Sequence, residues 1–446
     1  MATLIELKAV PVARAGRDVP GGTPSGKSPD PDLGHAMIPK HRYTSAEFMK
    51  LEWDTMWTKV WLAGGREEVI PDPGDWMTHE IGTESLIFVR QDDGAIKGFF
   101  NVCPHRGNRL LEKNAVGSAA TFTCGYHHWE FTTDGREANI PDRETFPQLQ
   151  GCAALHLKTV RVELWAGFIF FTMNAEALPL LDYLGEIPRH LDPYRFADQK
   201  LIEWKTIEWD CNWKTCVDAF NETYHVQAIH PELMSWLDDW NVQIDVFGKH
   251  SRYLIPFMTP SPRYPDQANP SDILRAGAEA MGIDPDAFAG NPRGLRLEMQ
   301  RIKRAGQDDS LFPYKALNDD QLTDDYHYSI FPNVSLNVHS DDVMMFRMRP
   351  HATDPNKMFY DIWIFELVPH GEEWPERVRH QRFRHGDRSI GQVLDQDAFN
   401  LPTVQKGMQS DAFPGLWIGD QELRIRGFHK ALSDYIYPDG QEPGEL

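Results

Sequence analysis

Short runs in which hydrophobic and polar residues alternate dominate the chain between residues 60 and 175. Alternation with a period of two predicts β-strands that are buried on one face, and pairs such as Asp93-Gly94 and Asp134-Gly135 between such runs predict hairpin turns. This region is therefore expected to form a small antiparallel β domain. Its hairpins are predicted over Ser85–Val89 with Ile96–Val102, after Trp129–Thr133, and over Val160–Leu164 with Gly167–Met173.

The chain on either side of this region has longer-period patterns. Residues 1–40 are rich in Gly, Pro and charge and predict a loose arm, and an amphipathic helix is predicted over Ser45–Val60. After residue 175 helical patterns alternate with extended runs. The strands expected there are Leu201–Trp209, Val343–Arg349 and Phe359–Leu367.

These patterns predict an α+β protein with three parts. They are an N-terminal arm and helix (1–57), a β domain (58–175) and an α+β domain (176–446). The last part contains a polar, helix-capable insertion at about 265–325, with helices expected over Ser271–Met281 and Pro292–Arg304. The sequence leaves two interpretations of this insertion open: a lid over a pocket, or a solvent-exposed segment with no function.

Composition excludes several classes of protein. With 45 Lys and Arg against 66 Asp and Glu, the net charge is −21, which repels nucleic acids and anionic membrane surfaces. No apolar run approaches the roughly 20 residues that a membrane helix needs. The 446 residues are 41% hydrophobic, enough for a large core. The five cysteines are too few and too irregular for a disulfide framework, so a reducing cytoplasm is the expected location.

Two Cys/His pairs stand in the predicted β domain, each expected at a hairpin tip. Cys103 and His105 are followed, after 18 intervening residues, by Cys124 and His127. Two thiolates and two imidazoles are the ligands of a Rieske [2Fe–2S] centre, in which the cysteines hold one iron and the histidines the other. A structural zinc site takes the same ligands, so spacing alone leaves both open.

A second group of possible metal ligands follows Asn212-Trp213-Lys214. On one continuous helix Asp218, Glu222 and His225 would share a face, whereas His230 would point about 140° away from His225. We therefore expect the helix to end near Ala228-Ile229, where Pro231 favours extended backbone in the residue before it. Two histidines then converge, as in the two-His, one-carboxylate site of non-haem Fe(II) oxygenases.

The motifs together resemble the α subunits of Rieske ring-hydroxylating oxygenases. The first motif reads Cys103-Pro-His105-Arg106-Gly107 and then Cys124-x-Tyr126-His127-x-Trp129, and the second reads Glu222-x-Tyr224-His225-x4-His230. Gly125 and His128 stand where the family usually has Pro and Gly. These two departures concern loop shape and leave the four ligands in place.

The resemblance assigns the remaining site residues. It implies Asp397 as the third iron ligand, ahead of Gln405-Lys406-Gly407, with Asp395 as its competitor. It implies that Glu222 bridges an iron-ligand histidine and a cluster histidine of a neighbouring subunit, with Asp218 as alternate bridge or network member and Tyr224 as a further member of the catalytic set. The substrate pocket is expected near Phe220, Phe331 and Asn333.

The resemblance also implies a fold and a function. The catalytic domain is expected to adopt the helix-grip (Bet v 1/START-like) fold, in a ring of three α subunits, with or without β subunits. Such an α subunit takes electrons from NAD(P)H through a separate reductase, with or without a ferredoxin, stores them at its cluster and uses O2 at Fe(2+). We expect cis-dihydroxylation of an aromatic or other apolar substrate, with monooxygenation or oxidative demethylation as the alternative. A non-catalytic zinc or electron-transfer protein is the remote alternative.

Overall fold

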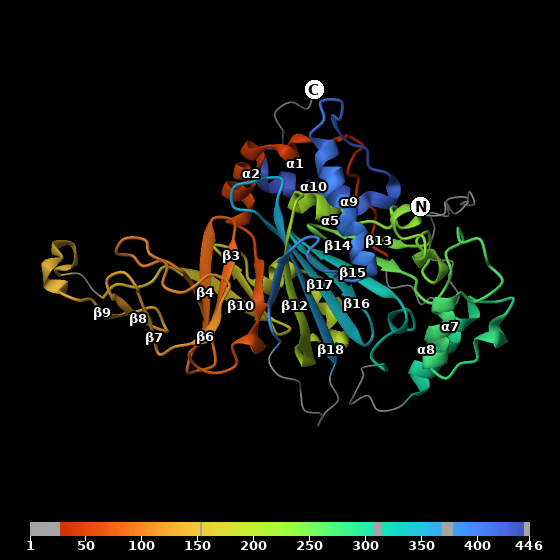
Figure 1. Cartoon of the computed structure of the whole chain (residues 1–446), viewed down its shortest axis with the longest axis horizontal. Helices are drawn as coiled ribbons and strands as arrows, with labels where there is room; N and C mark the ends of the chain where they lie inside the picture. The colour runs from red at the N-terminus through yellow and green to blue at the C-terminus, as the bar shows by residue number, and fades with distance from the viewer. Residues whose placement is uncertain (1–26, 152–153, 307–313, 368–377, 441–446) are drawn as a thin grey trace. The chain divides into compact units, whose positions relative to one another are not determined.

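The structure is a computed structural model that describes residues 27–151, 154–306, 314–367 and 378–440. The described chain forms two compact units (Figure 1). One, the β unit, comprises Lys50–Gly185 and Pro350–Asp354. The other, the α+β unit, comprises the described parts of Met1–Met49, Glu186–Arg349 and Pro355–Leu446. The predicted α+β class is confirmed.

The β unit contains one sheet of seven strands and one of three. The larger sheet has the order β2-β11-β10-β5-β4-β3-β6, and the smaller one has the order β7-β8-β9. Neighbouring strands in both sheets pair antiparallel. The strands are β2 (Leu62–Arg66), β3 (Asp75–Ile81), β4 (Glu84–Arg90), β5 (Ile96–Phe100), β6 (Val116–Ser118), β7 (Thr121–Thr123), β8 (Glu130–Thr132), β9 (Glu137–Asn139), β10 (Thr159–Trp165) and β11 (Phe168–Thr172).

The three predicted hairpins are present as β4–β5, β8–β9 and β10–β11. In the last of them Trp165 pairs with Phe168, so the turn consists of Ala166 and Gly167, both with positive φ. That is the geometry that matches the twist of two antiparallel strands. The loop that holds Cys103 joins β5 to β6, which are not neighbours in the sheet, so the expectation of a hairpin tip there is wrong.

The α+β unit is built on a sheet of eight strands in the order β13-β14-β15-β16-β17-β18-β12-β19. The sequence analysis did not predict strands β13 to β16. In β15 all six residues are buried, and strands covered on both faces lack the alternation on which strand prediction depends. The strands are β12 (Gln199–Trp209), β13 (Gln243–Phe247), β14 (His250–Ile255), β15 (Asp325–Ile330), β16 (Val334–Val338), β17 (Asp342–Pro350), β18 (Met358–Leu367) and β19 (Gln381–Arg384).

Four helices of this unit carry or flank the candidate site. They are α5 (Trp213–Ala219), α6 (Val226–Ile229), α9 (Gln392–Met408) and α10 (Leu423–Ile436). In Figure 1, α5, α9 and α10 gather at the same end of the eight-stranded sheet, and α10 contacts β13 and β14. The side chain of Asn212 caps α5 by accepting a hydrogen bond from the Lys214 N–H.

Two further helical regions were predicted and are present with shifted bounds. The helix expected over Ser45–Val60 is α2 (Ala46–Glu52), continued by a π-helical turn over Trp53–Trp57. The insertion contains α7 (Asp272–Ala280) and α8 (Gly294–Ala305).

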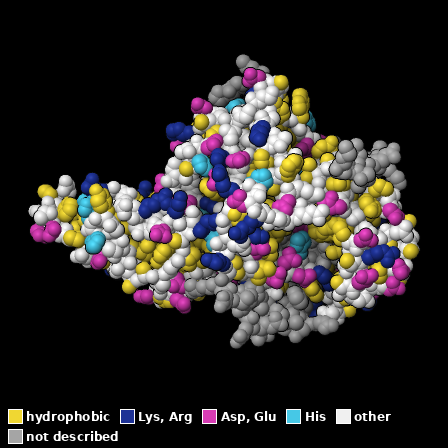
Figure 2. All heavy atoms as spheres, viewed as in Figure 1, with side chains coloured by type: hydrophobic (Ala, Val, Ile, Leu, Met, Phe, Trp, Pro, Cys, Tyr) yellow, Lys and Arg dark blue, Asp and Glu magenta, His cyan; other side chains and the backbone are white. Residues whose placement is uncertain are grey.

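The surface shows no obvious segregation of charge on the face drawn in Figure 2, where acidic, basic and hydrophobic side chains are interspersed. Within the part of the chain that the structure describes, every helix is too short or too polar to span a bilayer.

Candidate metal centres

The two Cys/His loops of the β unit have the same backbone pattern. In each, the cysteine N–H donates to the carbonyl five residues on, and its carbonyl accepts from the N–H four residues on. In the first loop Gly107 takes the fourth position with φ +78°, and in the second loop His128 takes it with φ +57°. A left-handed residue is thus required at that position, which is the usual reason for glycine there. The exposed His128 fills it in this chain.

The donor atoms of these loops fit a Rieske cluster. Cys103 and Cys124 are buried, each 1% exposed. The Nδ1 atoms of His105 and His127 are buried and have no hydrogen-bond partner among the described residues. The two imidazole rings lie 4.5 Å apart, and the Trp129 ring stacks on His105 at 4.6 Å. Two inward-facing nitrogens without partners beside two buried thiols are the set that a [2Fe–2S] centre needs.

A single zinc ion fits this arrangement less well. Zinc holds four ligands at about 2.0–2.3 Å, so their donor atoms must lie close to one another. Across the described ranges, three such donor atoms come within 4.8 Å of one another only at His225, His230 and Asp397. The four donors of the β unit are therefore spread more widely than one zinc ion allows.

The two cysteines differ in their electrostatic surroundings. Burial raises the pKa of the Cys103 thiol to about 11. Burial acts in the same direction on Cys124, but the backbone N–H groups of Tyr126 and His127 outweigh it and lower the pKa of that thiol. The Asn108 side chain adds a contact of 3.7 Å to the Cys124 sulfur. Donors aimed at a sulfur stabilise its thiolate form, which is the form that binds iron.

The second group of donors lies where α5 gives way to α6. The helix ends at Ala219 and restarts at Val226, so the expectation that Asp218, Glu222 and His225 share a face of one continuous helix is wrong. The expected end before His230 is confirmed, since α6 stops at Ile229. The break lets the segment turn back on itself, which a single helix could not do.

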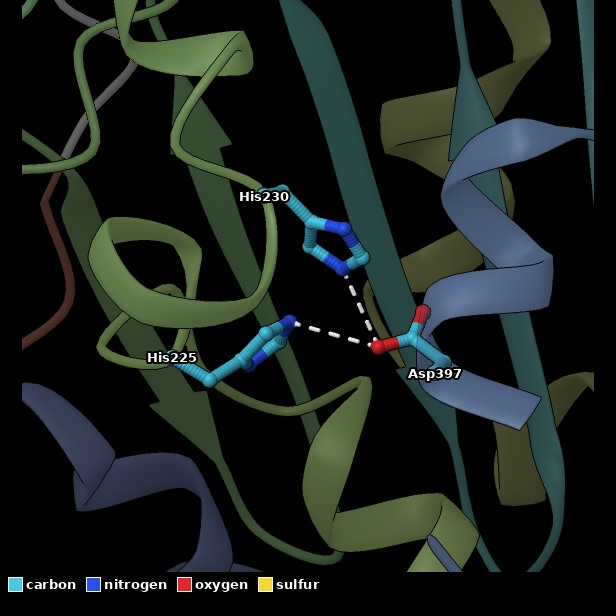
Figure 3. A group of neighbouring side chains, drawn as sticks. All are labelled: His225, His230 and Asp397. Carbon is cyan, nitrogen blue, oxygen red and sulfur yellow. Dashed lines mark hydrogen bonds and ion pairs between the residues drawn. The ribbon is translucent and has the colours of Figure 1, made fainter. Parts of the chain in front are cut away.

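The side chains of His225, His230 and Asp397 point toward one another (Figure 3). The Asp397 Oδ1 atom lies 3.0 Å from His230 Nε2 and 3.7 Å from His225 Nε2. Both histidines thus offer Nε2 to one point, and the carboxylate comes from α9. Two imidazoles and one carboxylate on one side of a point are the donors of a facial non-haem iron site, so the residues present fit Fe(2+).

Glu222 holds His225 in place. The Nδ1 atom of His225 lies 2.6 Å from Glu222 Oε1, and the backbone N–H of His225 donates to Oε2 at 3.0 Å. Burial lowers the pKa of His225, but the Glu222 carboxylate outweighs it and the pKa is raised overall. The Nδ1 proton is therefore fixed toward Glu222, and Nε2 is left free for the metal.

His230 is held by an amide. Its Nδ1 atom lies 2.7 Å from Gln396 Oε1, and the Nε2 of Gln396 donates to Glu232 Oε1 at 2.8 Å. Since a carboxylate only accepts, Glu232 fixes which end of the Gln396 amide faces His230. The three residues join the His230 segment to α9, so one clamp orients His230 and the helix that carries Asp397.

The structure separates the two candidate aspartates. Asp397 is buried in the group described above, whereas the Asp395 carboxylate accepts hydrogen bonds from the Ser389 hydroxyl at 2.5 Å and the Ile390 N–H at 2.9 Å. Asp395 thus stabilises the turn that precedes α9. The two aspartates stand two positions apart on the helix, about 200° of rotation, so their side chains point in different directions.

Asp218 belongs to a buried network beside this group. Its Oδ2 atom accepts a hydrogen bond from the Tyr43 hydroxyl at 2.5 Å, and the same hydroxyl lies 2.7 Å from His429 Nε2. Burial lowers the pKa of His429, which outweighs the raising effect of Asp218. Asp218 is thus held between the N-terminal segment and α10.

A cavity of about 540 Å³ opens onto the three-residue group. Asp218, Glu222, His225 and Asp397 line it together with Glu422 and apolar residues of α9 and of the segment before α10. Burial raises the pKa of Glu422, and the nearby carboxylates of Glu222 and Asp218 act in the same direction.

Four other residues from the sequence analysis lie apart from the lining of this cavity. Tyr224 is 53% exposed. The Phe220 ring packs on Phe346 at 4.7 Å, and the Phe331 ring stacks on Tyr435 at 5.5 Å. Asn333 donates from Nδ2 to the Met348 carbonyl.

Sequence reasoning missed Gln396, Glu232, Tyr43 and His429. Only Gln396 had a usable signal, because it directly precedes Asp397. Gln405, quoted as part of the C-terminal motif, has a structural role: its Oε1 accepts from the Asn212 N–H and from the Thr215 hydroxyl, both at 2.9 Å. It therefore fastens α9 to the start of α5.

The β unit with its two Cys/His loops and the α+β unit with its His, His, Asp group define a Rieske non-haem iron protein. Residues 60–155 match the Rieske [2Fe-2S] domain, and residues 196–437, more than half of the chain, match the catalytic domain of the ring hydroxylating alpha subunit. The chain belongs to this family of ring-hydroxylating oxygenase α subunits.

Curated relatives include enzymes of two kinds. The large oxygenase component of the 2,4-dinitrotoluene dioxygenase system of Burkholderia sp. (strain RASC) is 33% identical over 199 residues, 43% of this chain and 44% of that protein. The large oxygenase component of the naphthalene 1,2-dioxygenase system of Pseudomonas putida is 35% identical over 191 residues, 41% of this chain and 42% of that protein. The glycine betaine monooxygenase oxygenase subunit of Chromohalobacter salexigens is 32% identical over 210 residues, 47% of this chain and 46% of that protein. The chain thus matches less than half of the length of these relatives.

Solved structures share the fold over a longer span. The quaternary ammonium Rieske monooxygenase CntA in complex with L-carnitine superposes with a TM-score of 0.64 at 20% identity, over 92% of this chain and 99% of that one. Naphthalene 1,2-dioxygenase with bound indole superposes with a TM-score of 0.64 at 20% identity, over 91% of this chain and 94% of that one. The predicted pairing of a Rieske β domain with a catalytic domain of sheet and helices is confirmed.

Proposed function

We propose that the chain is the terminal oxygenase component of a multi-component system that adds oxygen from O2 to a small, mainly apolar organic substrate. The observation that carries this proposal is the presence, in one chain, of the Cys103/His105/Cys124/His127 set and of the His225/His230/Asp397 group. The relatives from Burkholderia and Pseudomonas bear the description of large oxygenase components of dioxygenase systems.

When bound, a [2Fe–2S] cluster would supply single electrons and a ferrous ion would supply the activation of O2. The chain's own residues do the rest. Glu222 and Gln396 each accept a hydrogen bond from the Nδ1–H of one histidine, so both Nε2 atoms face the metal position. The facial arrangement keeps the protein ligands on one side of that position, which leaves the opposite side for O2 and substrate.

The proposal includes partners. Electrons would come from NAD(P)H through a separate reductase, with or without a ferredoxin, and the location would be the cytoplasm. The assembly would be a homotrimer (α3) or an α3β3 ring. Glu222 lines an open cavity and is already bonded to His225, so it is suited to accept a hydrogen bond from a cluster histidine of a neighbouring subunit.

The main candidate reaction is cis-dihydroxylation of an aromatic or other apolar substrate, with Glu222, Asp218 and Tyr224 as the proposed catalytic set and Phe220, Phe331 and Asn333 near the substrate. Monooxygenation, including oxidative demethylation, is the second candidate. The glycine betaine monooxygenase subunit of Chromohalobacter salexigens, which is 32% identical over its matched part, supports this second candidate.

A single-turnover experiment tests the proposed function. The protein, loaded with cluster and iron and reduced chemically, is exposed to 18O2 with naphthalene, 2,4-dinitrotoluene or glycine betaine, and the products are analysed by mass. Two labelled oxygens in one product would indicate dioxygenation, and one would indicate monooxygenation. A fully loaded, reduced protein that consumes no O2 with any compound of a broad panel would contradict the proposal.

The Gln396 clamp gives a second testable prediction. Gln396→Leu should lower the affinity for Fe(2+) by about 10- to 100-fold, the usual effect of removing a group that orients a metal-bound histidine. The measurement is metal affinity by titration, with Co(2+) absorption as a report on the ligand geometry. Rescue by Gln396→Asn is not expected, because its shorter side chain cannot reach both His230 and Glu232.

The matched control is Gln392→Leu, one turn earlier on α9. Gln392 also contacts Glu232, at 3.3 Å, but its hydrogen bond does not reach a histidine. Its iron affinity should stay within about threefold of the wild-type value. Equal losses in both variants would show that the contact with Glu232, rather than the orientation of His230, matters.

A further inference from the structure

A second cavity, of about 670 Å³, lies in the α+β unit between α8, the chain that follows β14 and the turn from β16 to β17. No described residue lines both this cavity and the one at the three-residue group. Its walls are mainly apolar and include three methionines. The apolar lining residues used here are Phe257, Met258, Met281, Met299, Ile302 and Leu322.

The insertion builds one wall of this cavity. Helices α7 and α8 lie side by side in Figure 1, and their apolar faces form a buried cluster that includes Leu274, Leu295 and Met299. The fully buried Arg296 of α8 ties this helix to the chain that follows β14 and to the turn before β15: it donates to the Phe257 carbonyl at 3.0 Å and pairs with Asp320 and Asp324. Helices α7 and α8 are thus packed onto the unit through this cluster, which Trp236 and Met258 also contact.

Among the described lining residues, the charged groups on the cavity's polar side are paired with one another. Lys303 Nζ lies 2.7 Å from Asp341 Oδ2 and donates to the Ser340 hydroxyl, and His339 Nδ1 lies 2.9 Å from Asp342 Oδ1. A charged ligand would lose its hydration against apolar walls and meet countercharges that are already engaged. Methionine side chains adapt to varied apolar shapes. These walls therefore favour a neutral, mainly apolar molecule.

The cavity wall is hydrogen-bonded to the segment that follows His230. The Asp238 N–H donates to the Pro256 carbonyl at 2.9 Å, and the Thr259 N–H donates to the Trp236 carbonyl at 3.1 Å. The Trp236 ring contacts the Phe257 ring at 4.7 Å. Residues on both sides of the wall are thus tied to the chain that carries a candidate iron ligand.

We propose that this cavity is a binding site for a neutral, mainly apolar small molecule, and that it receives the substrate beside the His230 segment. Its volume lies within the roughly 300–1,000 Å³ of small-molecule sites. The second part rests on the proposed function, whereas binding itself does not. Of the two kinds of substrate named among the relatives, the site fits neutral aromatic compounds rather than quaternary ammonium compounds.

Binding of indole to the full-length, cluster- and iron-loaded protein, measured by calorimetry, tests the site. Met299→Trp, which fills the cavity from α8, should weaken indole binding at this site by at least about tenfold. The matched control is Leu297→Trp on the same helix, where residue 297 is 44% exposed and does not line the cavity; it should bind as the wild type does. With glycine betaine, any heat of binding should be the same for Met299→Trp as for the wild type.

A second variant guards against misfolding. If Met299→Trp lowers the melting temperature or the cluster absorption, Met281→Phe, at a half-buried lining position, takes its place. Indole binding that is unchanged in a folded cavity-filling variant, or glycine betaine binding that the filling removes, would overturn the proposal.

Turnover separates this inference from the proposed function. If the cavity receives the substrate, Met299→Trp should raise KM with kcat unchanged. Asp397→Ala should retain the indole binding that Met299→Trp removes, because the cavity does not include the iron ligands. Indole binding at the cavity without any oxygenation would support the cavity site and contradict the proposed oxygenase function. Oxygenation without indole binding at the cavity would support the oxygenase function and contradict the cavity site.

Discussion

Replacing Cys103 by serine should abolish the visible absorption of the Rieske cluster and leave iron binding at the His225, His230 and Asp397 group intact. The donors of the cluster come from two loops of the β unit, and the iron donors come from the α+β unit, so the two sets share no residue. Serine keeps the size of cysteine but offers no thiolate. Absorption spectroscopy and metal and sulfide analysis check the result; His127→Ala should behave in the same way.

The control for this substitution is Cys211→Ala, at a fully buried cysteine just before α5. Its absorption should match that of the wild type, since burial alone does not make a cysteine a ligand. An unchanged spectrum in Cys103→Ser would show that the cluster is not held by this loop. Bound zinc without sulfide in the wild-type protein would favour the structural zinc alternative.

The second large effect is expected at Asp397. Asp397→Ala should reduce product formation by more than about 100-fold, beyond the usual effect of losing an outer partner of a metal ligand, and should lower the content of mononuclear iron. The alanine leaves two imidazoles without the carboxylate that completes the donor set. Product yield and iron per chain are the measurements, with the cluster absorption as a check on folding.

Asp395→Ala is the matched control, two residues earlier on the same helix. Its carboxylate bonds to Ser389 and Ile390, so the substitution should cost about 1 kcal/mol of stability, as the loss of a helix-capping group does, and leave the iron content unchanged. Loss of iron in Asp395→Ala with retention in Asp397→Ala would exchange the roles of the two residues. Equal loss in both would show that the start of α9, rather than either carboxylate, governs iron binding.

The sequence predicted local features well where the physics is local. Hairpins with turns such as Asp93-Gly94 appeared at the expected positions, because alternation and turn-forming pairs act within a few residues. The same holds for the end of α6 before His230. Strands β14 and β15 were missed because all of their residues are buried, so they carry no period-two signal.

The sites were predictable to different depths. The donors of the proposed cluster could be identified from the sequence because all four are close together in it: Cys103, His105, Cys124 and His127. The contacts of His230 with Gln396 and of Asp218 with Tyr43 join residues more than 160 positions apart, as do those of Gln405 with Asn212. Such pairs depend on how the helices pack against the sheet, which no local pattern in one sequence specifies.

The double contact between Glu222 and His225 limits what can replace residue 222 over evolutionary time. One carboxylate oxygen reaches the imidazole and the other reaches the backbone N–H three residues on, so the length of the side chain and the width of the turn between α5 and α6 fit each other. Aspartate is shorter by one carbon–carbon bond, about 1.5 Å. From the same backbone it could keep one contact and would forfeit the other. An exchange of glutamate for aspartate in this lineage therefore requires a simultaneous change in the turn, and the two features should be inherited as a pair.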